Sequence, residues 1–408
     1  MIEPSAKATK PLKVLLLNQT FYPDVMATAQ YLTELAIQLQ QRGHTVSVIT
    51  SRRAYDQPDK QFPADEYWQG IKIRRVWGSR FGKLAKWRRA ADFATFIMSC
   101  CWRLLWTPRQ DVVVALTSPP LISWIAAWFT RLRGGRFCYW VMDMNPDEAV
   151  AAGWLRKGAL VTRILENFSR FSLRTAARIV VLDRFMRDLV LQKGIEAEKI
   201  SIISPWSQDE LVKFDGPGRD AFRQKHNFGE RFLVMHAGNH SPCHPLDTLL
   251  DAARELRDDS SIAFCFQGGG SELAKVKQRT AMEKLPNVTC LPYQPVKQLS
   301  AALSAADAHV VVMGEPFVGT IHPCKIYNAL AVGAPIVYIG PAQSHVTDLL
   351  GPAAAHIGVR HGEATLLATK LRVLSQNRNR LPQSEQQRIA ALSSRAALLP
   401  KMVAAIED

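Results

Sequence analysis

The 408-residue sequence has few cysteines, and their spacing is typical of neither a metal site nor a disulfide framework. The seven cysteines form no C-x-x-C pair, and two of them, Cys100 and Cys101, are adjacent. This usage favours a reducing cytoplasm. The residues before Pro11 are polar and lack the apolar stretch of a signal peptide, so nothing here predicts export.

An uninterrupted membrane span is also missing. The stretch 112–130 carries no charge and is about as long as a span needs. However, Pro119 and Pro120 lie in its middle and would break a spanning helix. We therefore predict a buried parallel strand at Val112–Leu116 and a helix at Leu121–Leu132.

Acidic residues are in deficit, with 36 Asp and Glu against 51 Lys and Arg and a net charge of +15. Such an excess attracts nucleic acids, anionic lipids or nucleotide substrates without choosing among them. Between Lys72 and Arg109 ten basic residues stand against one acid, Asp92. We expect an anionic partner to meet the chain there.

What is present is a repeated alternation of short apolar runs and helical patterns. Lys13–Leu17, a helical stretch at Ala27–Arg42 and a β-rich run at Thr45–Thr50 form one βαβ unit. Further strands are predicted at Ile71–Val76, Phe137–Met142, Ile179–Leu182, Ile200–Ile203, Phe232–His236, Ile262–Phe266, Val288–Leu291, Ala308–Met313 and Pro335–Ile339. The pattern predicts two doubly wound, Rossmann-like α/β domains.

The domain boundary is expected near residues 207–220, where Asp215-Gly216-Pro217-Gly218 is rich in turn formers. We assign residues 1–210 to an N-terminal domain and residues 211–384 to a C-terminal domain. The tail 385–408 has helical spacing and is expected to pack back onto the first domain.

The first candidate site motif is a strand that ends in Ala237-Gly238-Asn239, with a helix beginning near Pro245. Such a junction directs free backbone N–H groups and the positive end of a helix at one point, which suits a phosphate. An ordinary βα turn explains it equally well. Three histidines lie nearby, but Gly238 and two prolines prevent one helix from presenting them together, so we do not predict a metal site. They are His236, His240 and His244.

A second motif, Gln267-Gly268-Gly269-Gly270, follows the next predicted strand. Consecutive glycines allow a backbone to approach a ligand closely, although a glycine-rich turn without a ligand remains open. The motif is neither G-x-G-x-x-G nor a P-loop, which argues against dinucleotide and NTP binding.

A third motif combines a loop, Gly314-Glu315-Pro316-Phe317, with a helix that begins at Pro323 and carries Lys325 in its first turn. A lysine there opposes the helix dipole, so its expected role is to meet an anion such as a diphosphate. The alternative is a solvated lysine.

Together these motifs resemble, in order and over nearly the whole chain, the retaining GT-B glycosyltransferases of family 4, particularly the colanic-acid and O-antigen sugar transferases. The strings that carry the resemblance are Phe21-Tyr22-Pro23-Asp24, Arg42-Gly43-His44-Thr45-Val46-Ser47-Val48-Ile49-Thr50, Thr117-Ser118-Pro119-Pro120, Asp143-Met144-Asn145-Pro146-Asp147, Ala237-Gly238-Asn239, Pro323-Cys324-Lys325 and Leu330-Ala331-Val332-Gly333-Ala334-Pro335.

The resemblance implies a GT-B fold, two Rossmann-like domains facing a cleft. It implies a nucleotide sugar, UDP- or GDP-linked, on the C-terminal domain, an acceptor on the N-terminal domain, and no metal or other cofactor. Gly238 and Asn239 would border the phosphates, and Lys325 would hold the diphosphate. The remaining implied donor residues are Glu315, which faces the sugar, Phe317, Val318 and Gly319, which offer amides, and His240, Gly268, Gly269 and Asn328.

The sequence departs from the family pattern at three places. A Gly-Gly of the first loop is replaced by Val25-Met26-Ala27-Thr28, and the second of two glutamates is replaced by Asn328. His240 and His244 stand where the family often has Arg and Lys, which predicts less positive charge near the phosphate.

Two features of the N-terminal half remain. Asp143, Asp147 and Glu148 follow a predicted strand where such folds place ligands, and one of them is expected to orient the acceptor hydroxyl, or alternatively to cap a helix; we name Asp143 and Asp147 as catalytic candidates. A basic and aromatic segment suits a helix in an anionic lipid interface, although a buried helix beside a solvated basic loop is also possible. Its residues are Arg80, Lys83, Lys86, Trp87, Arg88, Arg89 and Trp102.

The sequence therefore predicts a glycosyltransferase that uses a nucleotide sugar and a lipid-linked or polysaccharide acceptor for cell-surface polysaccharide synthesis, at the inner face of the cytoplasmic membrane. No recognition motif predicts nucleic-acid binding. Two alternatives stay open, a sugar-nucleotide epimerase of similar architecture and a basic membrane-surface protein without enzymatic activity.

Overall fold

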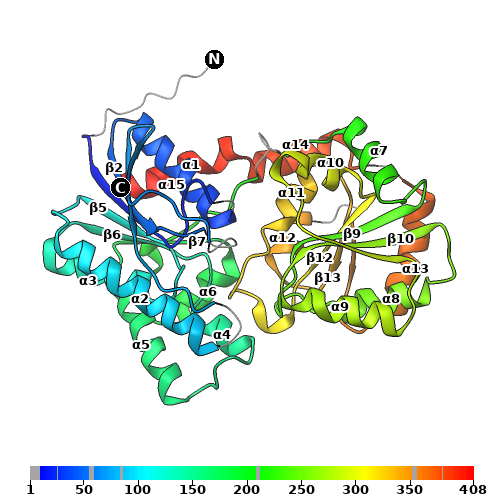
Figure 1. The fold of residues 1–408 in the computed structure, drawn as a ribbon, viewed down its shortest axis with the longest axis horizontal. Coiled ribbons are helices and arrows are strands. Elements are labelled where there is room, and N and C mark those ends of the chain that lie inside the picture. The colour runs from blue at the N-terminus through cyan, green and yellow to red at the C-terminus, as the bar shows by residue number, and fades with distance from the viewer. Residues whose placement is uncertain are drawn as a thin grey trace. The chain divides into compact units, whose positions relative to one another are not determined.

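The computed structural model describes residues 10–24, 26–54, 59–82, 86–207, 212–351, 356–378 and 380–408. The chain divides into two compact units (Figure 1). Unit 1 comprises Met1–Ser204 with Leu399–Asp408, and unit 2 comprises Pro205–Leu398. Each unit has its own sheet with helices on its faces, as the alternating sequence pattern predicts.

The sheet of unit 1 has the strand order β3-β4-β2-β1-β5-β6-β7-β8 and is parallel except for the β3–β4 pair. Its strands are β1 (Lys13–Leu17), β2 (Thr45–Ser51), β3 (Asp65–Trp68), β4 (Ile71–Val76), β5 (Val112–Ala115), β6 (Arg136–Trp140), β7 (Arg178–Val181) and β8 (Ile200–Ile202). The helices are α1 (Ala27–Gln41), α2 (Lys86–Leu105), α3 (Ile122–Arg133), α4 (Asp147–Ala151), α5 (Leu160–Thr175), α6 (Arg184–Gln192) and the 3-10 turn η1 (Ala197–Lys199).

The sheet of unit 2 has the order β11-β10-β9-β12-β13-β14 and is parallel. Its strands are β9 (Phe232–Asn239), β10 (Ile262–Gly269), β11 (Val288–Leu291), β12 (Ala308–Val312), β13 (Ile336–Ile339) and β14 (Ile357–Val359). The helices are α7 (Gly216–Lys225), α8 (Asp247–Glu255), α9 (Ser271–Met282), η2 (Val296–Gln298), α10 (Leu299–Ser304), η3 (Glu315–Phe317), α11 (Lys325–Ala331), α12 (His345–Leu350), α13 (Ala364–Gln376) and α14 (Gln383–Ser393).

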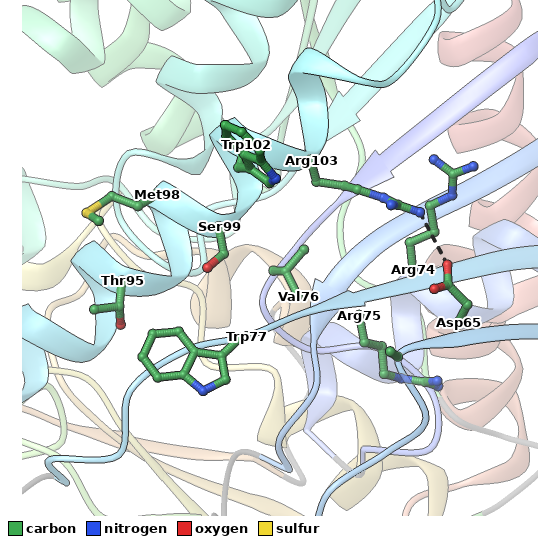
Figure 2. A pocket seen from close by; sticks show the side chains of 11 residues that line it. Asp65, Arg74, Arg75, Val76, Trp77, Thr95, Met98, Ser99, Trp102 and Arg103 are labelled. Carbon is green, nitrogen blue, oxygen red and sulfur yellow. Dashed lines mark hydrogen bonds and ion pairs between the residues drawn. The ribbon is translucent and has the colours of Figure 1, made fainter.

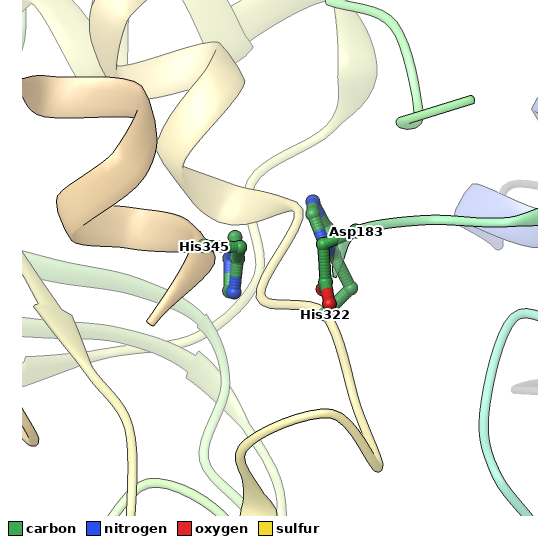
Figure 3. A group of neighbouring side chains, drawn as sticks. All are labelled: Asp183, His322 and His345. Atoms are coloured by element: carbon green, nitrogen blue, oxygen red, sulfur yellow. The ribbon is translucent and has the colours of Figure 1, made fainter. Parts of the chain in front are cut away.

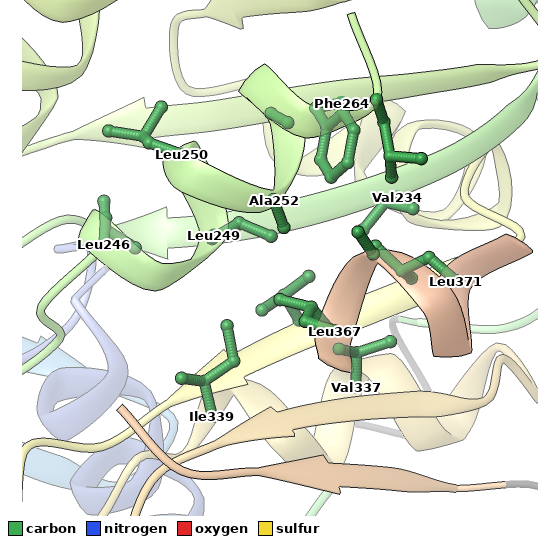
Figure 4. Close-up of a cluster of buried hydrophobic side chains, with 14 of the residues drawn as sticks. Val234, Leu246, Leu249, Leu250, Ala252, Phe264, Val337, Ile339, Leu367 and Leu371 are labelled. Atoms are coloured by element: carbon green, nitrogen blue, oxygen red, sulfur yellow. The ribbon is translucent and has the colours of Figure 1, made fainter. Parts of the chain in front are cut away.

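The core of unit 2 explains why its strands are apolar at nearly every position. Val234 of β9 faces a cluster that includes Leu249 of α8 and Leu367 of α13 (Figure 4). The next residue along β9, Met235, faces the opposite cluster with Phe222 of α7. Successive side chains of a strand point to opposite faces, so a strand buried on both faces reads as a continuous apolar run.

The predicted membrane exclusion at 112–130 agrees with the structure. Val112–Ala115 forms the buried strand β5, and α3 begins at Ile122, after the two prolines. Among the described residues, none of the helices combines the length and the apolar character needed to cross a bilayer.

The C-terminal tail corrects one boundary of the sequence prediction. The sequence predicts that all of 385–408 packs onto the first domain, but α14 belongs to unit 2 and only Leu399–Asp408, within α15 (Arg395–Glu407), belongs to unit 1. The expected change of domain at 210–211 lies outside the described residues, and the division between the units falls between Ser204 and Pro205.

Candidate functional site

Lys325, the first residue of α11, is the centre of the candidate site in unit 2. Its ammonium Nζ donates to the carbonyl oxygen of Asn239 at 3.1 Å and lies 3.2 Å from Nε2 of His236. Burial lowers the pKa of Lys325 to about 7. A desolvated ammonium held by one carbonyl and one imidazole is a cation poised to accept an anionic ligand.

Gly238 leaves the space beside this ammonium open. It has a positive φ of 116°, and a Cβ built on it would lie 3.7 Å from Cε of Lys325. A side chain here would therefore stand against the lysine, and the left-handed backbone would be strained for any residue with a Cβ. The structure brings together Gly238, Asn239 and Lys325 from two separate sequence motifs.

The glycines after β10 have a different explanation. A Cβ on Gly268 would lie 1.9 Å from the carbonyl oxygen of Gly238, and one on Gly269 would lie 2.7 Å from the Tyr293 ring. A Cβ on Gly270 would lie 2.3 Å from the carbonyl oxygen of His240. The packing of the chain against itself thus requires Gly268, and a side chain at Gly269 would have to displace the exposed Tyr293 ring. The sequence motif instead suggests that a ligand requires both glycines.

The three histidines around Lys325 are neutral partners of backbone carbonyls. His236 Nδ1 lies 3.1 Å from the oxygen of Val310, and His244 Nδ1 lies 2.7 Å from that of Val312. Burial, and next the charge of Lys325, hold the pKa values of both well below their usual range, and the same causes lower the pKa of His240 to about 4. With Nδ1–H donating, the Nε2 lone pair of His236 accepts from Lys325.

This neutrality has a consequence for the positive charge of the site. His240 and His244 are uncharged at neutral pH, each imidazole keeping a single ring N–H. Lys325 is therefore the principal cation that these two loops and the start of α11 present. His240 Nε2 is buried with no hydrogen-bond partner among the described residues.

The loop after β12 places its residues differently from our expectation. Glu315 is exposed at the start of η3, and Phe317 is buried. The Phe317 amide donates to the oxygen of Gly314 at 3.0 Å, and the Val318 amide to that of Glu315 at 3.4 Å. From the sequence we expect these amides to face a donor, whereas in the structure they donate within the turn itself. Gly319, with φ 75°, follows the turn.

Helix α11 makes a second polar contact through Tyr327, two residues after Lys325. The Tyr327 hydroxyl lies 2.7 Å from Nε2 of His322, and the His322 ring stacks on His345 with centroids 3.8 Å apart (Figure 3). Asn328 lies half-buried on the same helix. Figure 3 also draws Asp183, whose carboxylate caps α6 of unit 1 by accepting from the Met186 amide at 2.8 Å.

In unit 1, the carboxylates after β6 fall into two kinds. Asp147 forms an ion pair with Lys193, at 2.8 Å from Nζ. Burial raises the pKa of Asp143 above its usual range, and burial followed by the charge of Asp143 raises that of Glu148, which Arg89 opposes. Asp143 and Glu148 are therefore protonated more readily than ordinary carboxyls, whereas Asp147 is engaged by a lysine.

Glu148 is the residue whose importance the sequence understates. Asp143 and Asp147 are the candidates from sequence because both border the end of a strand. The first turn of α4 instead gives Asp147 a basic partner and sets Glu148 beside Asp143. Knowledge of where Lys193 lies would be needed to separate them, and Lys193 is 46 residues away in sequence.

The basic and aromatic segment is an amphipathic helix preceded by a strand. One face of α2 buries Phe96, Cys100 and Leu104, and the opposite face exposes apolar residues. The exposed set comprises Trp87, Met98, Trp102 and Leu105, with Trp106 just after the helix. Lys83 lies outside the described residues, the side chain of Lys86 is not described, and Arg80 forms an ion pair with Asp59.

Not every one of the ten basic residues between Lys72 and Arg109 belongs to the surface. Arg75 of β4 is buried, with 1% of its side chain exposed, and it donates to Glu66 at 2.6 Å and to the oxygen of Tyr22 at 2.8 Å. Arg88 and Arg89 lie over the rings of Trp87 and Phe93. The surface charge between Lys72 and Arg109 is thus smaller than the sequence count suggests, because Arg75 is buried.

Each of the two units matches a known protein family. Residues 27–206 match the family described as Glycosyl transferase 4-like domain, and residues 218–388 match the family Glycosyl transferases group 1. The Escherichia coli (strain K12) protein WcaI, named for a glycosyl transferase role in colanic acid biosynthesis, is 25% identical over 356 residues, 83% of this chain and 86% of that protein.

Solved structures share the whole architecture. Sucrose-phosphate synthase from Thermosynechococcus elongatus has a TM-score of 0.74 at 14% identity and covers 96% of this chain and 97% of its own. Anabaena HepE in complex with UDP and glucose has a TM-score of 0.70 at 16% identity, with 96% and 98% covered. At these identities the likeness concerns the fold.

Proposed function

The chain belongs to the two-domain GT-B glycosyltransferases, and we propose that it transfers a sugar from a UDP- or GDP-linked donor to a lipid-linked or polysaccharide acceptor in cell-surface polysaccharide synthesis. Both matched families are glycosyltransferases, which favours sugar transfer over epimerisation or a non-enzymatic role. The name of the colanic acid relative supports the proposed biosynthetic context. The HepE complex with UDP supports a nucleotide donor.

One observation carries the donor assignment, namely the position of Lys325 beside Gly238 and Asn239. A diphosphate brought to Gly238 would meet the Lys325 ammonium, which already lies 3.1 Å from the adjacent carbonyl. Charge that develops on a departing diphosphate is stabilised by a cation fixed in advance. We assign Lys325 this role, and Glu315 and Asn328 to the sugar and ribose hydroxyls.

The proposed reaction needs one bond exchange. The bond between the anomeric carbon and the diphosphate oxygen breaks, and a bond from the acceptor oxygen to the same carbon forms on the same face. The acceptor proton passes to the departing diphosphate, so no external acid or oxidant is required. The sugar carbon passes through an oxocarbenium-like state. Charge neutralisation by Lys325 supports a metal-independent reaction.

We assign the acceptor to unit 1, near Asp143 and Glu148. Where two buried carboxyls lie near each other and one is ionised, the ionised one can accept a hydrogen bond from a sugar hydroxyl. Because Asp147 is paired with Lys193 at 2.8 Å, we retain it as a residue that positions the start of α4. This assignment replaces Asp147 by Glu148 as the partner of Asp143.

We further propose that the protein is peripheral at the inner face of the cytoplasmic membrane. The exposed apolar face of α2, with Trp87 and Trp102 and the nearby Arg88 and Arg89, has the composition of an interfacial helix. A lipid-linked acceptor would be reached from that surface. No described feature calls for a nucleic-acid partner.

Donor binding and turnover test the proposed function together. A thermal-shift panel of nucleoside diphosphates should raise the melting temperature for UDP or GDP, and release of the diphosphate from the matching nucleotide sugar should be measurable. Lys325→Ala and Glu315→Ala should each reduce turnover at least about tenfold. Arg257→Ala, at an exposed position after α8, serves as the control.

Two results would overturn parts of this assignment. Undiminished turnover in Lys325→Ala would remove the donor site from α11. An isomeric nucleotide sugar as the product, formed without any acceptor, would establish an epimerase instead.

A further inference from the structure

A pocket of about 600 Å³ lies in unit 1 between α2 and the strands β3 and β4 (Figure 2); we call it the α2–β4 pocket. Three of its lining side chains are large, apolar and more than half exposed: Trp77 at 56%, Met98 at 66% and Trp102 at 65%. Thr95 and Ser99 of α2 line it between them. A volume of this size accommodates a small ligand or the headgroup of a larger one.

The charged lining of the pocket comprises the guanidinium groups of Arg74, Arg75 and Arg103 and the carboxylate of Asp65. Arg75 is paired with Glu66 outside this set, which leaves Arg74 and Arg103. Arg103 Nη2 donates to Oδ1 of Asp65 at 3.2 Å. Burial lowers the pKa of Arg74, and the neighbouring charge of Arg103 lowers it further, against the opposing effect of Asp65. The Nε atoms of Arg74 and Arg103 are buried without a hydrogen-bond partner among the described residues. The single carboxylate of Asp65 therefore faces the guanidinium groups of both Arg74 and Arg103, and this part of the pocket has a net positive charge.

This combination of groups matches an amphiphile with an anionic head. Guanidinium groups bind phosphate oxygens through paired N–H donors, and tryptophans favour the boundary between water and hydrocarbon. We propose that the α2–β4 pocket binds the phosphate headgroup of a membrane lipid, with Arg74 and Arg103 on the phosphate and the apolar part against Trp77, Met98 and Trp102.

The outer face of α2 favours a lipid over a soluble phosphate. Trp102 and Met98 line the pocket and also belong to the exposed apolar face of α2, which continues to Leu105 and Trp106. A soluble phosphate would use the arginines and leave this surface in water, whereas a lipid covers both. The inference rests on the proposed membrane association and adds to it a headgroup site.

Vesicle binding by the full chain tests the inference. Phosphatidylcholine vesicles carry either phosphatidic acid or oleate, adjusted to the same surface potential, so that only the chemistry of the anion differs. The wild type should bind the phosphatidic acid vesicles about fivefold more tightly or better. Arg74→Gln and Arg103→Gln should each abolish this roughly fivefold preference for phosphatidic acid. Their binding to oleate vesicles should be no weaker than that of the Lys72→Gln variant.

Lys72→Gln is a matched control. Lys72 is an exposed residue of the same strand as Arg74, two positions before it, and does not line the pocket. It removes one positive charge from the same strand, so it reports the loss of diffuse electrostatic attraction. Arg103→Lys provides a variant that keeps the charge and the fold but loses the paired donors; it should also lose preference for phosphatidic acid. Circular dichroism checks each variant.

The outcomes separate the pocket from the membrane proposal. Equal binding to both vesicle types, or equal losses in Lys72→Gln and Arg74→Gln, would overturn the pocket and leave membrane association standing. Absence of binding to either vesicle would overturn both, while diphosphate release measured in solution would still stand. Glycerol 3-phosphate that stabilises the wild type but not Arg74→Gln, without vesicle binding, would make the pocket a soluble phosphate site and overturn the lipid.

Discussion

At the scale of single residues, Lys325 predicts a pH dependence of donor binding. Burial lowers its pKa to about 7, so in the free protein it loses its proton above that pH. A diphosphate favours the charged form, so binding at higher pH must take up a proton. We expect UDP or GDP affinity to fall from about pH 7 to about pH 9, by up to about tenfold per pH unit, as calorimetry in buffers of different ionisation enthalpy would measure.

Two substitutions distinguish this effect from a general loss of charge. Lys325→Arg keeps its proton throughout the range and should show little pH dependence, whereas Lys325→Ala should bind weakly at every pH. A wild-type affinity that stays constant over the same interval would show that the ammonium does not meet the ligand.

The carboxyl pair of unit 1 predicts a stability change of definite sign. The pKa of Glu148 is raised above its ordinary 4.5 by burial and by Asp143, so the folded protein keeps a proton that the unfolded chain has lost. Stability is therefore greatest below the ordinary value and falls as pH rises through the folded pKa, by about 1.4 kcal/mol per pH unit at most. Glu148→Gln should reduce this slope.

Tryptophan fluorescence during urea unfolding measures that slope selectively. Of the ten tryptophans, only Trp206 belongs to unit 2, so the signal reports on unit 1. Glu196→Gln, which changes an exposed carboxylate of the same unit, is the control. Identical slopes in the wild type and Glu148→Gln would mean that Glu148 is not buried with Asp143.

Residue roles are the part that the sequence predicts least well. The motif containing Lys325 can be identified from sequence, because a lysine in the first turn opposes the helix dipole and therefore gains no local stabilisation there. The glycine motif predicts a ligand beside Gly268, although a Cβ on this residue would lie 1.9 Å from the Gly238 carbonyl oxygen. The charge count treats Arg75 as part of a basic surface, although it is buried against Glu66. Both contacts join segments that are distant in sequence, and no local pattern encodes such contacts.

At the scale of elements, α15 is held to unit 1 by its last residues. Glu407 accepts from His44 Nε2 at 2.8 Å and lies 3.1 Å from Nη2 of Arg42, while Arg136 donates to the Glu407 carbonyl at 2.9 Å. The side chain of Glu407 is largely buried. Glu407→Ala should lower the stability of unit 1 by about 1–3 kcal/mol, since it leaves buried donors unpaired.

A double-mutant cycle with His44→Ala checks that prediction. If the contact carries the effect, the two substitutions together should cost less than the sum of their separate effects. Strict additivity would show that Glu407 stabilises the unit without His44.

The elements themselves are largely predictable, because both sheets are buried on both faces and their strands read as apolar runs. Two strands, β3 and β14, are absent from the sequence prediction, and both lie at sheet edges. β3 (Asp65–Trp68) is a polar edge strand antiparallel to β4, and β14 has three residues. An edge strand needs no continuous apolar run, and three residues give no periodicity. Helix α14 has helical spacing, yet spacing does not tell which unit it joins.

At the scale of the whole molecule, our proposal assigns the nucleotide donor to unit 2 and the acceptor to unit 1. Hydrogen exchange can test where the nucleotide binds. A ligand that binds only the folded donor site suppresses local opening around that site. With UDP or GDP bound to the full chain, we expect slower amide exchange at 236–243 and 314–328, the loops beside Lys325. The strands of the unit 1 sheet should change little. The Lys325→Ala variant, measured under the same conditions, should lose the protection at both loops. Protection confined to residues 10–204 would contradict our assignment, because it would place the nucleotide on unit 1.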